Sequence, residues 1–250
     1  MRVIFINRFY WPETPATAQL LTDLAEGLAA RGWDVTVITS GPAELAAQET
    51  RGGVLIVRVP ALPRAGGSLA SKARDFLRFH LGAAAQLWQR ARRDTVVVAL
   101  TDPPLLAVTG AAIARLRGAR LAHWVHDIYP ELAITLAGQQ WARALLPLRN
   151  AAWRTADRCV TLGEDMASRI TAAGVAPTTV AVIPNWSPRG VEPADPAAIR
   201  SQRAVWGLTD RCVVMYSGNL GRVHPALLTR ADSNGLAILR EHDGVGRHAG

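Results

Sequence analysis

Short apolar runs alternate with amphipathic stretches along most of the chain. The runs are rich in valine and isoleucine, as in Val35–Thr39 and Val96–Leu100, and their length suits β-strands. Between them, leucines recur at helical spacing, as in Thr17–Ala30, where Arg31 and Gly32 mark the expected helix end. Continuous apolar strands separated by helices predict an α/β fold, a Rossmann-like doubly wound parallel sheet with both faces covered.

The same pattern gives the order of the elements in this first part of the chain. Further helices are expected at Leu69–Arg93, Leu105–Arg117 and Glu164–Ala173, with one or two more ending by Ala156. The expected strands are Val3–Asn7, Val35–Thr39, Val54–Val59, Val96–Leu100, Leu121–Val125, Cys159–Leu162 and Val180–Ile183.

A proline-rich segment interrupts this alternation. PNWSPRGVEPADP, residues 184–196, contains four prolines and is typical of a linker. We therefore expect a Rossmann-like domain over residues 1–184, a linker over 185–204 and an incomplete start of a second Rossmann-like domain over 205–250. After the proline-rich segment, a helix around Ile199–Trp206 and a strand at Cys212–Ser217 are predicted. Residues 225–250 lack a strand–helix pattern and are expected to be poorly ordered.

The composition is that of a globular protein with a basic surface. Hydrophobic residues make up 49% of the 250 residues and charged residues 19%, which is enough apolar material for a core. The formal net charge is +8, and it comes from arginine, because Lys72 is the only lysine. Such a charge favours an anionic partner: a nucleotide, a nucleic acid or an acidic lipid surface.

Targeting signals and cysteines add little to this picture. No apolar run reaches the roughly 18 residues of a membrane span, and MRVIFINRFYWPE is typical of a first strand rather than a signal peptide. Cys159 and Cys212 lie in apolar, strand-like runs and are expected to be buried free thiols. We therefore expect a cytoplasmic protein.

Two loops that follow strands are candidate binding segments, because ligands of open parallel sheets bind beyond the carboxyl ends of the strands. In RFYWPETPATAQ, Ala16 and Thr17 at the helix start leave backbone N–H groups open to an anion or a sugar hydroxyl. An ordinary capped helix entry is the alternative. In TDPPLLAV, residues 101–108, Asp102 either caps the next helix or lines a site.

The third loop, HWVHDIYPE at residues 123–131, carries the most chemistry. His126 and Asp127 end a strand, so the aspartate can orient the histidine or both can bind substrate hydroxyls, and a purely structural pair is the alternative. Glu131 then opens a helix. A metal site that includes His123 is disfavoured, because His123 and His126 point to opposite faces of the strand.

Three common motifs are missing from the sequence. Without G-x-G-x-x-G after the first strand, a dinucleotide bound in the usual Rossmann manner is disfavoured. Neither G-x-S-x-G nor a phosphate-binding G-x-x-x-x-G-K-[ST] loop is present, so hydrolase and nucleoside-triphosphatase interpretations lose support.

Six segments, taken in order from Met1 to about His224, resemble one family. They are TAQLLTDLAEGLAARGWDVTVIT, TDPP, WVHDIYPE, ADRCVTLGEDM, VIPNW and YSGNLGRVH. The chain resembles the GT-B retaining glycosyltransferases of family 4 type, most closely the bacterial group that builds extracellular and capsular polysaccharides, of the colanic-acid type. The resemblance implies two Rossmann-like domains that face each other across a cleft. The first binds the acceptor, and the second holds a nucleotide-diphosphate sugar as co-substrate, without a metal or other cofactor.

The resemblance also implies roles for particular residues. His126 and Asp127 are the expected catalytic residues, at the transferred sugar or the acceptor. Acceptor binding is expected at Ala16, Thr17, Asp102 and Glu131. The glycine turn of YSGNLGRVH would stabilise the charge on a departing diphosphate, and its expected donor-binding residues are Gly218, Asn219, Gly221 and Arg222.

The end of the chain departs from the family pattern. The family carries two glutamates, eight positions apart, deep in its second domain, whereas Glu241 is the only glutamate after His224 in this sequence. We expect a truncated or frame-shifted product, and the alternative is a short architecture that a partner chain completes. The activity of this chain by itself is left open.

The helix over Leu69–Arg93 suggests where such an enzyme works. A helical wheel places its apolar residues on one face and its basic residues, with Phe79 among them, on the rest. An exposed aromatic on a basic face suits docking on an anionic membrane, as a lipid-linked acceptor would require. A solvated outer face is the alternative, and nucleic acid fits less well. The expected docking residues are Lys72, Arg74, Arg78, Phe79, Arg90 and Arg92.

Two other classes of function compete with the transferase. One is a non-catalytic module that binds an acceptor or a partner chain. The other is a Rossmann oxidoreductase, disfavoured by the missing glycine motif and the missing acidic ribose ligand after the second strand.

Overall fold

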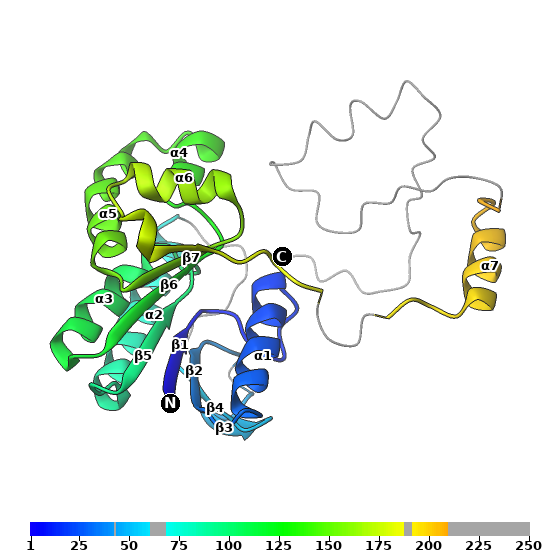
Figure 1. Cartoon of the computed structure of the whole chain (residues 1–250), viewed down its shortest axis with the longest axis horizontal. Coiled ribbons are helices and arrows are strands. Elements are labelled where there is room, and N and C mark those ends of the chain that lie inside the picture. The colour runs from blue at the N-terminus through cyan, green and yellow to red at the C-terminus, as the bar shows by residue number, and fades with distance from the viewer. Residues whose placement is uncertain (43, 61–68, 188–191, 210–250) are drawn as a thin grey trace. The chain divides into compact units, whose positions relative to one another are not determined.

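The computed structural model describes residues 1–42, 44–60, 69–187 and 192–209. The chain divides into two compact units, Met1–Pro188 and Arg189–Gly250. In the first unit, helices lie on both faces of one mixed, mostly parallel sheet (Figure 1). This arrangement confirms the predicted α/β, doubly wound fold.

The sheet of the described residues has eight strands in the order β3-β4-β2-β1-β5-β6-β7-β8. All neighbours are parallel except β3 and β4. Strand β1 lies between β2 and β5, with Val3 opposite Val35 and Val96. Because helices cover both faces of these central strands, their sequences are apolar throughout. The strands are Arg2–Ile6 (β1), Asp34–Thr39 (β2), Gln48–Arg51 (β3), Val54–Arg58 (β4), Thr95–Ala99 (β5), Arg120–Val125 (β6), Arg158–Thr161 (β7) and Val180–Val182 (β8).

The helices divide the core into two parts, one on each face of the sheet. Helix α1 packs on one face, with Leu20 and Leu21 against β1, β2 and β4. Helices α2, α3, α5 and α6 pack on the other face. The helices are Ala16–Ala29 (α1), Leu69–Arg90 (α2), Leu106–Arg117 (α3), Glu131–Ala137 (α4), Leu146–Thr155 (α5), Glu164–Ala172 (α6) and Pro196–Val205 (α7), with 3-10 turns at Gln140–Leu145 (η1) and Pro177–Thr179 (η2).

One strand was missing from the predicted elements. Strand β3 is short and polar, and it pairs antiparallel with β4 at the edge of the sheet. Because an edge strand with exposed side chains needs no apolar pattern, hydrophobic periodicity does not predict it. The other predicted elements of the first unit are present, with ends that differ by a few residues.

The predicted orientation of α2 is wrong. Phe79, Ala83 and Leu87 are buried and face the sheet, whereas Leu77 is 58% exposed. Helix and sheet meet closely at Gly82, where a Cβ would lie 2.9 Å from Cβ of Val59. This close approach determines which side of α2 faces the sheet. Hydrophobic periodicity in the sequence does not reveal such a contact. Phe79 is therefore a core residue and not a membrane-docking residue.

The second unit is described only over residues 192–209. Helix α7 begins after Asp195, whose carboxylate accepts hydrogen bonds from the backbone N–H groups of Ala197 (3.0 Å) and Ala198 (3.3 Å). The predicted helix near residue 199 is thus present. The predicted strand Cys212–Ser217, the residues after 225 and the donor-binding residues lie outside the described part of the chain.

Candidate functional site

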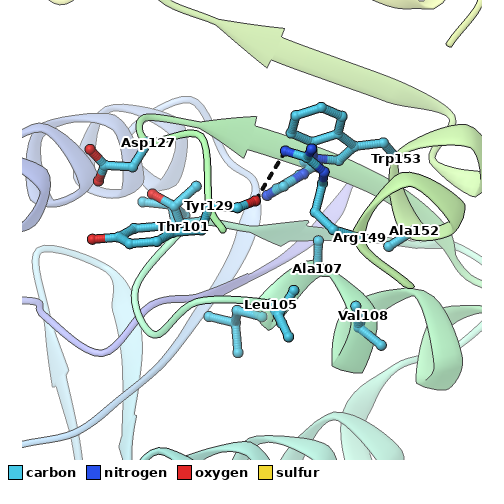
Figure 2. A pocket seen from close by; sticks show the side chains of 12 residues that line it. Thr101, Leu105, Ala107, Val108, Asp127, Tyr129, Arg149, Ala152 and Trp153 are labelled. Carbon is cyan, nitrogen blue, oxygen red and sulfur yellow. Dashed lines mark hydrogen bonds between the residues drawn. The ribbon is translucent and has the colours of Figure 1, made fainter. Parts of the chain in front are cut away.

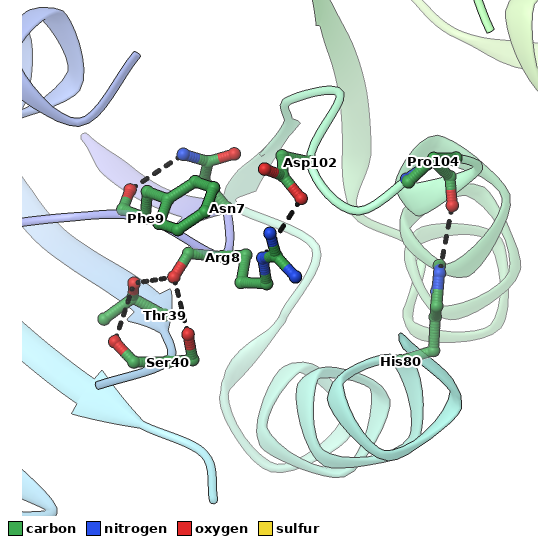
Figure 3. Close-up of polar contacts among 8 residues, drawn as sticks. All are labelled: Asn7, Arg8, Phe9, Thr39, Ser40, His80, Asp102 and Pro104. Atoms are coloured by element: carbon green, nitrogen blue, oxygen red, sulfur yellow. Dashed lines mark hydrogen bonds and ion pairs between the residues drawn. The ribbon is translucent and has the colours of Figure 1, made fainter. Parts of the chain in front are cut away.

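The loops after β1 and β5 meet at the carboxyl edge of the sheet (Figure 3). The backbone N–H of Arg8 donates to the carbonyl of Asp102 at 2.8 Å, and Nε of Arg8 lies 3.2 Å from Oδ1 of Asp102. The guanidinium carbon of Arg8 lies 4.5 Å from the ring centroid of Phe9 and 5.3 Å from that of Phe76 on α2. These contacts fix a partly exposed ion pair at the edge where ligands of parallel sheets bind.

Asp102 does not cap the helix that follows it. The residue before α3 is Leu105, in a left-handed conformation (φ 66°), and no side chain caps the helix there. A leucine in this conformation is uncommon, since its Cβ crowds the backbone. Asp102 instead pairs with Arg8, so the capping alternative is wrong, and the alternative that Asp102 lines a site stays a prediction.

Ala16 and Thr17 form the first turn of α1, directly after Pro15. Ala16 is exposed and Thr17 is partly buried. No side chain caps this helix start. The N–H of Ala18 donates to the carbonyl of Pro15 at 2.8 Å, whereas the N–H groups of Ala16 and Thr17 stand at the helix start, a position that favours an anion or a hydroxyl.

His126 directly follows β6, and its ring lies beside that of Trp124, with ring centroids 4.5 Å apart and planes inclined at 59°. Burial lowers the pKa of His126 to about 4, so the ring is neutral at pH 7. Asp127 is exposed on one side, and partial burial of its carboxyl raises its pKa. No hydrogen bond joins His126 to Asp127 in the described structure, so the aspartate does not orient the histidine here.

His123 points to the opposite face of β6, as predicted. Its ring is 5% exposed and lies 6.3 Å from the ring of Trp153 on α5. Burial, together with the charges of Arg149 and His126, lowers the pKa of His123 to about 3. Within the described ranges, no group of three or more His, Cys, Asp or Glu residues is placed to hold a metal ion.

A small cavity of about 20 Å³ lies on this second face of β6 (Figure 2). Arg149 closes one side: its guanidinium donates to the carbonyl of Tyr129 at 3.0 Å and lies 3.7 Å from the ring centroid of Trp153. Arg149 also forms an ion pair with Glu131 at the start of α4. Glu131 thus pairs with a buried arginine in the structure. The expected part of Glu131 in acceptor binding stays a prediction.

The segment after β8 crosses back toward the site. Trp186 stacks on Trp124, with ring centroids 5.8 Å apart and planes inclined at only 11°. Both indoles belong to the core cluster on the α1 face. The proline-rich segment is therefore attached to β6 through an aromatic contact next to His126.

Comparison with known proteins settles the family. Residues 17–186 match the sequence pattern of the family described as glycosyl transferase 4-like domain, which is more than half of the chain. The chain belongs to this family. The stretch that matches includes α1 from Thr17 onward, the loop after β5, His123, His126 and Trp186.

Two curated relatives of this glycosyltransferase-family chain are bacterial. The putative colanic acid biosynthesis glycosyl transferase WcaI of Escherichia coli (strain K12) is 25% identical over 249 residues, which cover 88% of this chain and 59% of that protein. The probable glycosyltransferase WbjE of Pseudomonas aeruginosa is 32% identical over 108 residues, 42% of this chain and 27% of that protein. The chain thus spans well under two thirds of the length of these relatives.

Solved structures show the same fold. Sucrose-phosphate synthase from Thermosynechococcus elongatus has a TM-score of 0.63 at 15% identity, over 82% of this chain and 52% of that one. Anabaena HepE in complex with UDP has a TM-score of 0.54 at 13% identity, over 84% of this chain and 51% of that one. These likenesses confirm the predicted GT-B type of fold.

Several residues of the candidate site were not predicted. Arg8 and Tyr129 are ordinary loop residues in the sequence, and only the meeting of separate strand ends brings them together. Arg149 lies far along the chain, in an amphipathic helix where an arginine is normally exposed, so nothing predicted its burial. The aromatic residues Trp124 and Trp186 stood inside quoted motifs, and their spacing gave no sign that they stack.

Proposed function

We propose that this glycosyltransferase-family chain transfers a sugar from a nucleotide-diphosphate sugar to a saccharide acceptor, and that its first unit binds the acceptor. The observation that carries the proposal is the position of Arg8, Asp102, His126 and Asp127 in the loops after the neighbouring strands β1, β5 and β6, at one edge of the sheet. HepE is bound to UDP and to UDP-glucose in its structures, which supports a nucleotide sugar as the donor. The name of WcaI supports polysaccharide biosynthesis as the setting.

The described residues suit the handling of sugar hydroxyls. A neutral His126 can accept one hydrogen bond and donate another, and Asp127 offers carboxylate oxygens on its exposed side. The first turn of α1 adds backbone N–H groups near Ala16 and Thr17. We propose retention of the anomeric configuration and transfer without a metal, in which the positive charge for the leaving diphosphate comes from protein groups.

A transfer assay tests this proposal. The purified chain is incubated with UDP- and GDP-sugars and a lipid-linked saccharide, and the released nucleoside diphosphate is measured with and without EDTA. The account expects release that EDTA leaves unchanged and that His126→Ala lowers about 100-fold. NMR of the product then gives the anomeric configuration. Saturable acceptor binding without any nucleotide release would instead indicate a non-catalytic binding module.

A lipid-linked acceptor would place the chain at a membrane surface, and we propose helix α2 as the docking element. In the described part of the chain, no helix is long and apolar enough to cross a bilayer. The outer face of α2 exposes Leu77 (58%), Leu81 (63%) and Trp88 (48%), beside the exposed Arg74 and Arg78. Apolar side chains with flanking arginines suit an anionic lipid interface. Leu77 and Leu81 are therefore the proposed apolar docking residues, instead of Phe79, which the sequence had suggested.

Docking is tested by flotation with phosphatidylglycerol vesicles and with phosphatidylcholine vesicles. Exchange of both Arg74 and Arg78 for Glu should abolish flotation with the anionic vesicles. Exchange of Arg120 and Arg158, which are exposed at strand starts, for Glu is the charge-matched control and should retain it. Equal flotation of the two double variants would remove α2 from the account. Of the other expected docking residues, Arg92 is exposed and Arg90 is partly buried against Gln86.

A further inference from the structure

Tyr129 lies in the loop between β6 and α4, two residues after Asp127. It is partly buried, and together with Thr101 and Asp127 it lines the small cavity at this end of the sheet. The hydroxyl of Tyr129 and the carboxylate of Asp127 both point away from Arg149 and Trp153 (Figure 2). The two polar groups therefore lie toward the loop edge, where Asp127 is exposed.

The main chain of Tyr129 is held from the inside of the molecule. Its carbonyl accepts a hydrogen bond of 3.0 Å from the guanidinium of Arg149, which is only 5% exposed. The same guanidinium pairs with Glu131 and lies 3.7 Å from the ring centroid of Trp153. A buried arginine with these partners has little freedom to move. The position of the Tyr129 backbone is therefore fixed without any contact from the phenol hydroxyl.

The phenol hydroxyl of Tyr129 is left available to a ligand. In the described part of the chain it makes no hydrogen bond, and its oxygen is not among the fully buried polar atoms. The hydroxyl of Tyr10, in contrast, is completely enclosed. Partial burial and the charges of Asp127 and Asp102 raise the pKa of Tyr129, so its hydroxyl is neutral at pH 7 and can donate a hydrogen bond.

The charges around the phenol favour an uncharged ligand. Asp102 is paired with Arg8, whose Nε lies 3.2 Å from Oδ1 of the aspartate. Among the described residues Asp127 forms no ion pair, so a phosphate or carboxylate of a ligand would be repelled beside it. A hydroxyl group, which is both a donor and an acceptor, suits a phenol donor next to a carboxylate acceptor.

We propose that Tyr129 contacts the acceptor at an uncharged sugar residue, whose hydroxyl accepts a hydrogen bond from the phenol and donates one to Asp127. The proposal rests on the proposed function, in which the first unit binds a saccharide acceptor. A sugar without this hydroxyl leaves both protein groups unsatisfied, and a sugar with a carboxylate there meets the charge of Asp127. Tyr129 thus selects the acceptor by the presence and charge of one substituent.

NMR of the 250-residue chain labelled with [ζ-¹³C]tyrosine tests the contact. The chain has three tyrosines, and the Tyr129 signal is identified by its loss in Tyr129→Phe. The uncharged probes are the methyl glycosides of glucose, galactose and mannose, and glucuronate is the charged probe. At least one uncharged probe should shift the Tyr129 signal saturably while the signal of the enclosed Tyr10 stays in place. An equal or larger shift with glucuronate overturns the proposed selection by charge.

Kinetics with the lipid-linked saccharide of the transfer assay give the second readout. Tyr129→Phe should raise the acceptor KM about fivefold, since it removes one hydrogen bond, and should leave the donor KM and the urea unfolding midpoint unchanged. Tyr10→Phe makes the same chemical change at an enclosed hydroxyl and is the matched control, with an unchanged acceptor KM.

The two readouts separate this proposal from the proposed function. Transfer with a wild-type acceptor KM in Tyr129→Phe, or saturable probe binding that leaves the Tyr129 signal in place, overturns the contact and leaves the transferase standing. A saturable Tyr129 shift in a chain that transfers no sugar overturns the proposed transfer and retains the sugar contact. Neither transfer nor any shift of the Tyr129 signal overturns both.

Discussion

His123 lies within strand β6 and His126 follows its last residue, and the two histidines have different surroundings. His123 is enclosed by Trp153 and Arg149 and serves as core. His126 is partly exposed directly after the strand, and its ring centroid lies 4.5 Å from that of Trp124. Both rings are held neutral by burial. Residue type and a low pKa are common to both rings, so they do not distinguish the proposed functional histidine from the core histidine; the position of His126 at the carboxyl edge of the sheet does.

Substitution of Arg149, on the His123 side of β6, should cause the largest loss of stability. Arg149→Met eliminates a guanidinium that is nearly fully buried and bonded to Glu131 and to the carbonyl of Tyr129. The partners left behind are unpaired, so the free energy of unfolding in urea should fall by about 3 kcal/mol. Arg120→Met at an exposed position is the matched control and should change it by less than about 0.5 kcal/mol. Equal effects of the two substitutions would show that Arg149 does not stabilise the His123 side of β6.

Substitution of Asp127, at the carboxyl edge of the sheet beside His126, should lower activity without lowering stability. Asp127→Asn removes a charge at an exposed position, so the unfolding free energy should stay within about 0.5 kcal/mol of wild type. If Asp127 handles the acceptor or the sugar, kcat/KM should fall on the order of 100-fold. Asp165→Asn, exposed on α6, provides the control and should keep full activity. Full activity of the Asp127 variant would exclude this carboxylate from the site.

Lowering the pH should destabilise the folded protein through both His123 and His126. The folded-state pKa values of about 3 for His123 and about 4 for His126 lie below the ordinary value of 6.5. Below pH 6.5 the unfolded chain therefore binds more protons, and stability falls as the pH falls. Each histidine contributes up to about 1.4 kcal/mol per pH unit in this range. Urea unfolding at pH 7, 6 and 5 should show this slope, and His123→Gln should reduce it; a pH-independent wild type would contradict the burial of both rings.

The smallest effect is expected at the ion pair between the two site loops. Asp102→Asn weakens a partly exposed pair with Arg8, which is worth at most about 1 kcal/mol. Thermal unfolding should therefore change little, while the acceptor KM should rise because the loop edge is less well fixed. A large loss of stability would mean that this pair belongs to the core rather than to the site.

Much of the fold and part of the site could be predicted from the sequence. The apolar strands are buried on both faces, so their runs are continuous and easily recognised, and His126 and Asp127 follow directly from the end of one such strand. The orientation of α2 could not be predicted, because it depends on the close approach of Gly82 to Val59. Likewise, Arg149 and Trp186 reach β6 only through tertiary contacts between distant segments.

The burial of Cys159 is an example of a feature that the local sequence alone predicts. Cys159 was expected to be a buried free thiol and is one, and burial raises its pKa to about 11. This outcome follows from its place in an apolar strand alone. The prediction for Cys212 lies outside the described residues, as do those for the donor-binding residues.

The most direct test of the account compares His126→Gln with His123→Gln in the same sugar-transfer assay, at a temperature where urea unfolding shows both variants to be folded. The account predicts that His126→Gln lowers kcat about 100-fold with near wild-type stability. It predicts that His123→Gln keeps kcat within a few-fold of wild type but unfolds at lower urea concentration. The reverse pattern, with activity lost in His123→Gln and retained in His126→Gln, would contradict the assignment of the functional face.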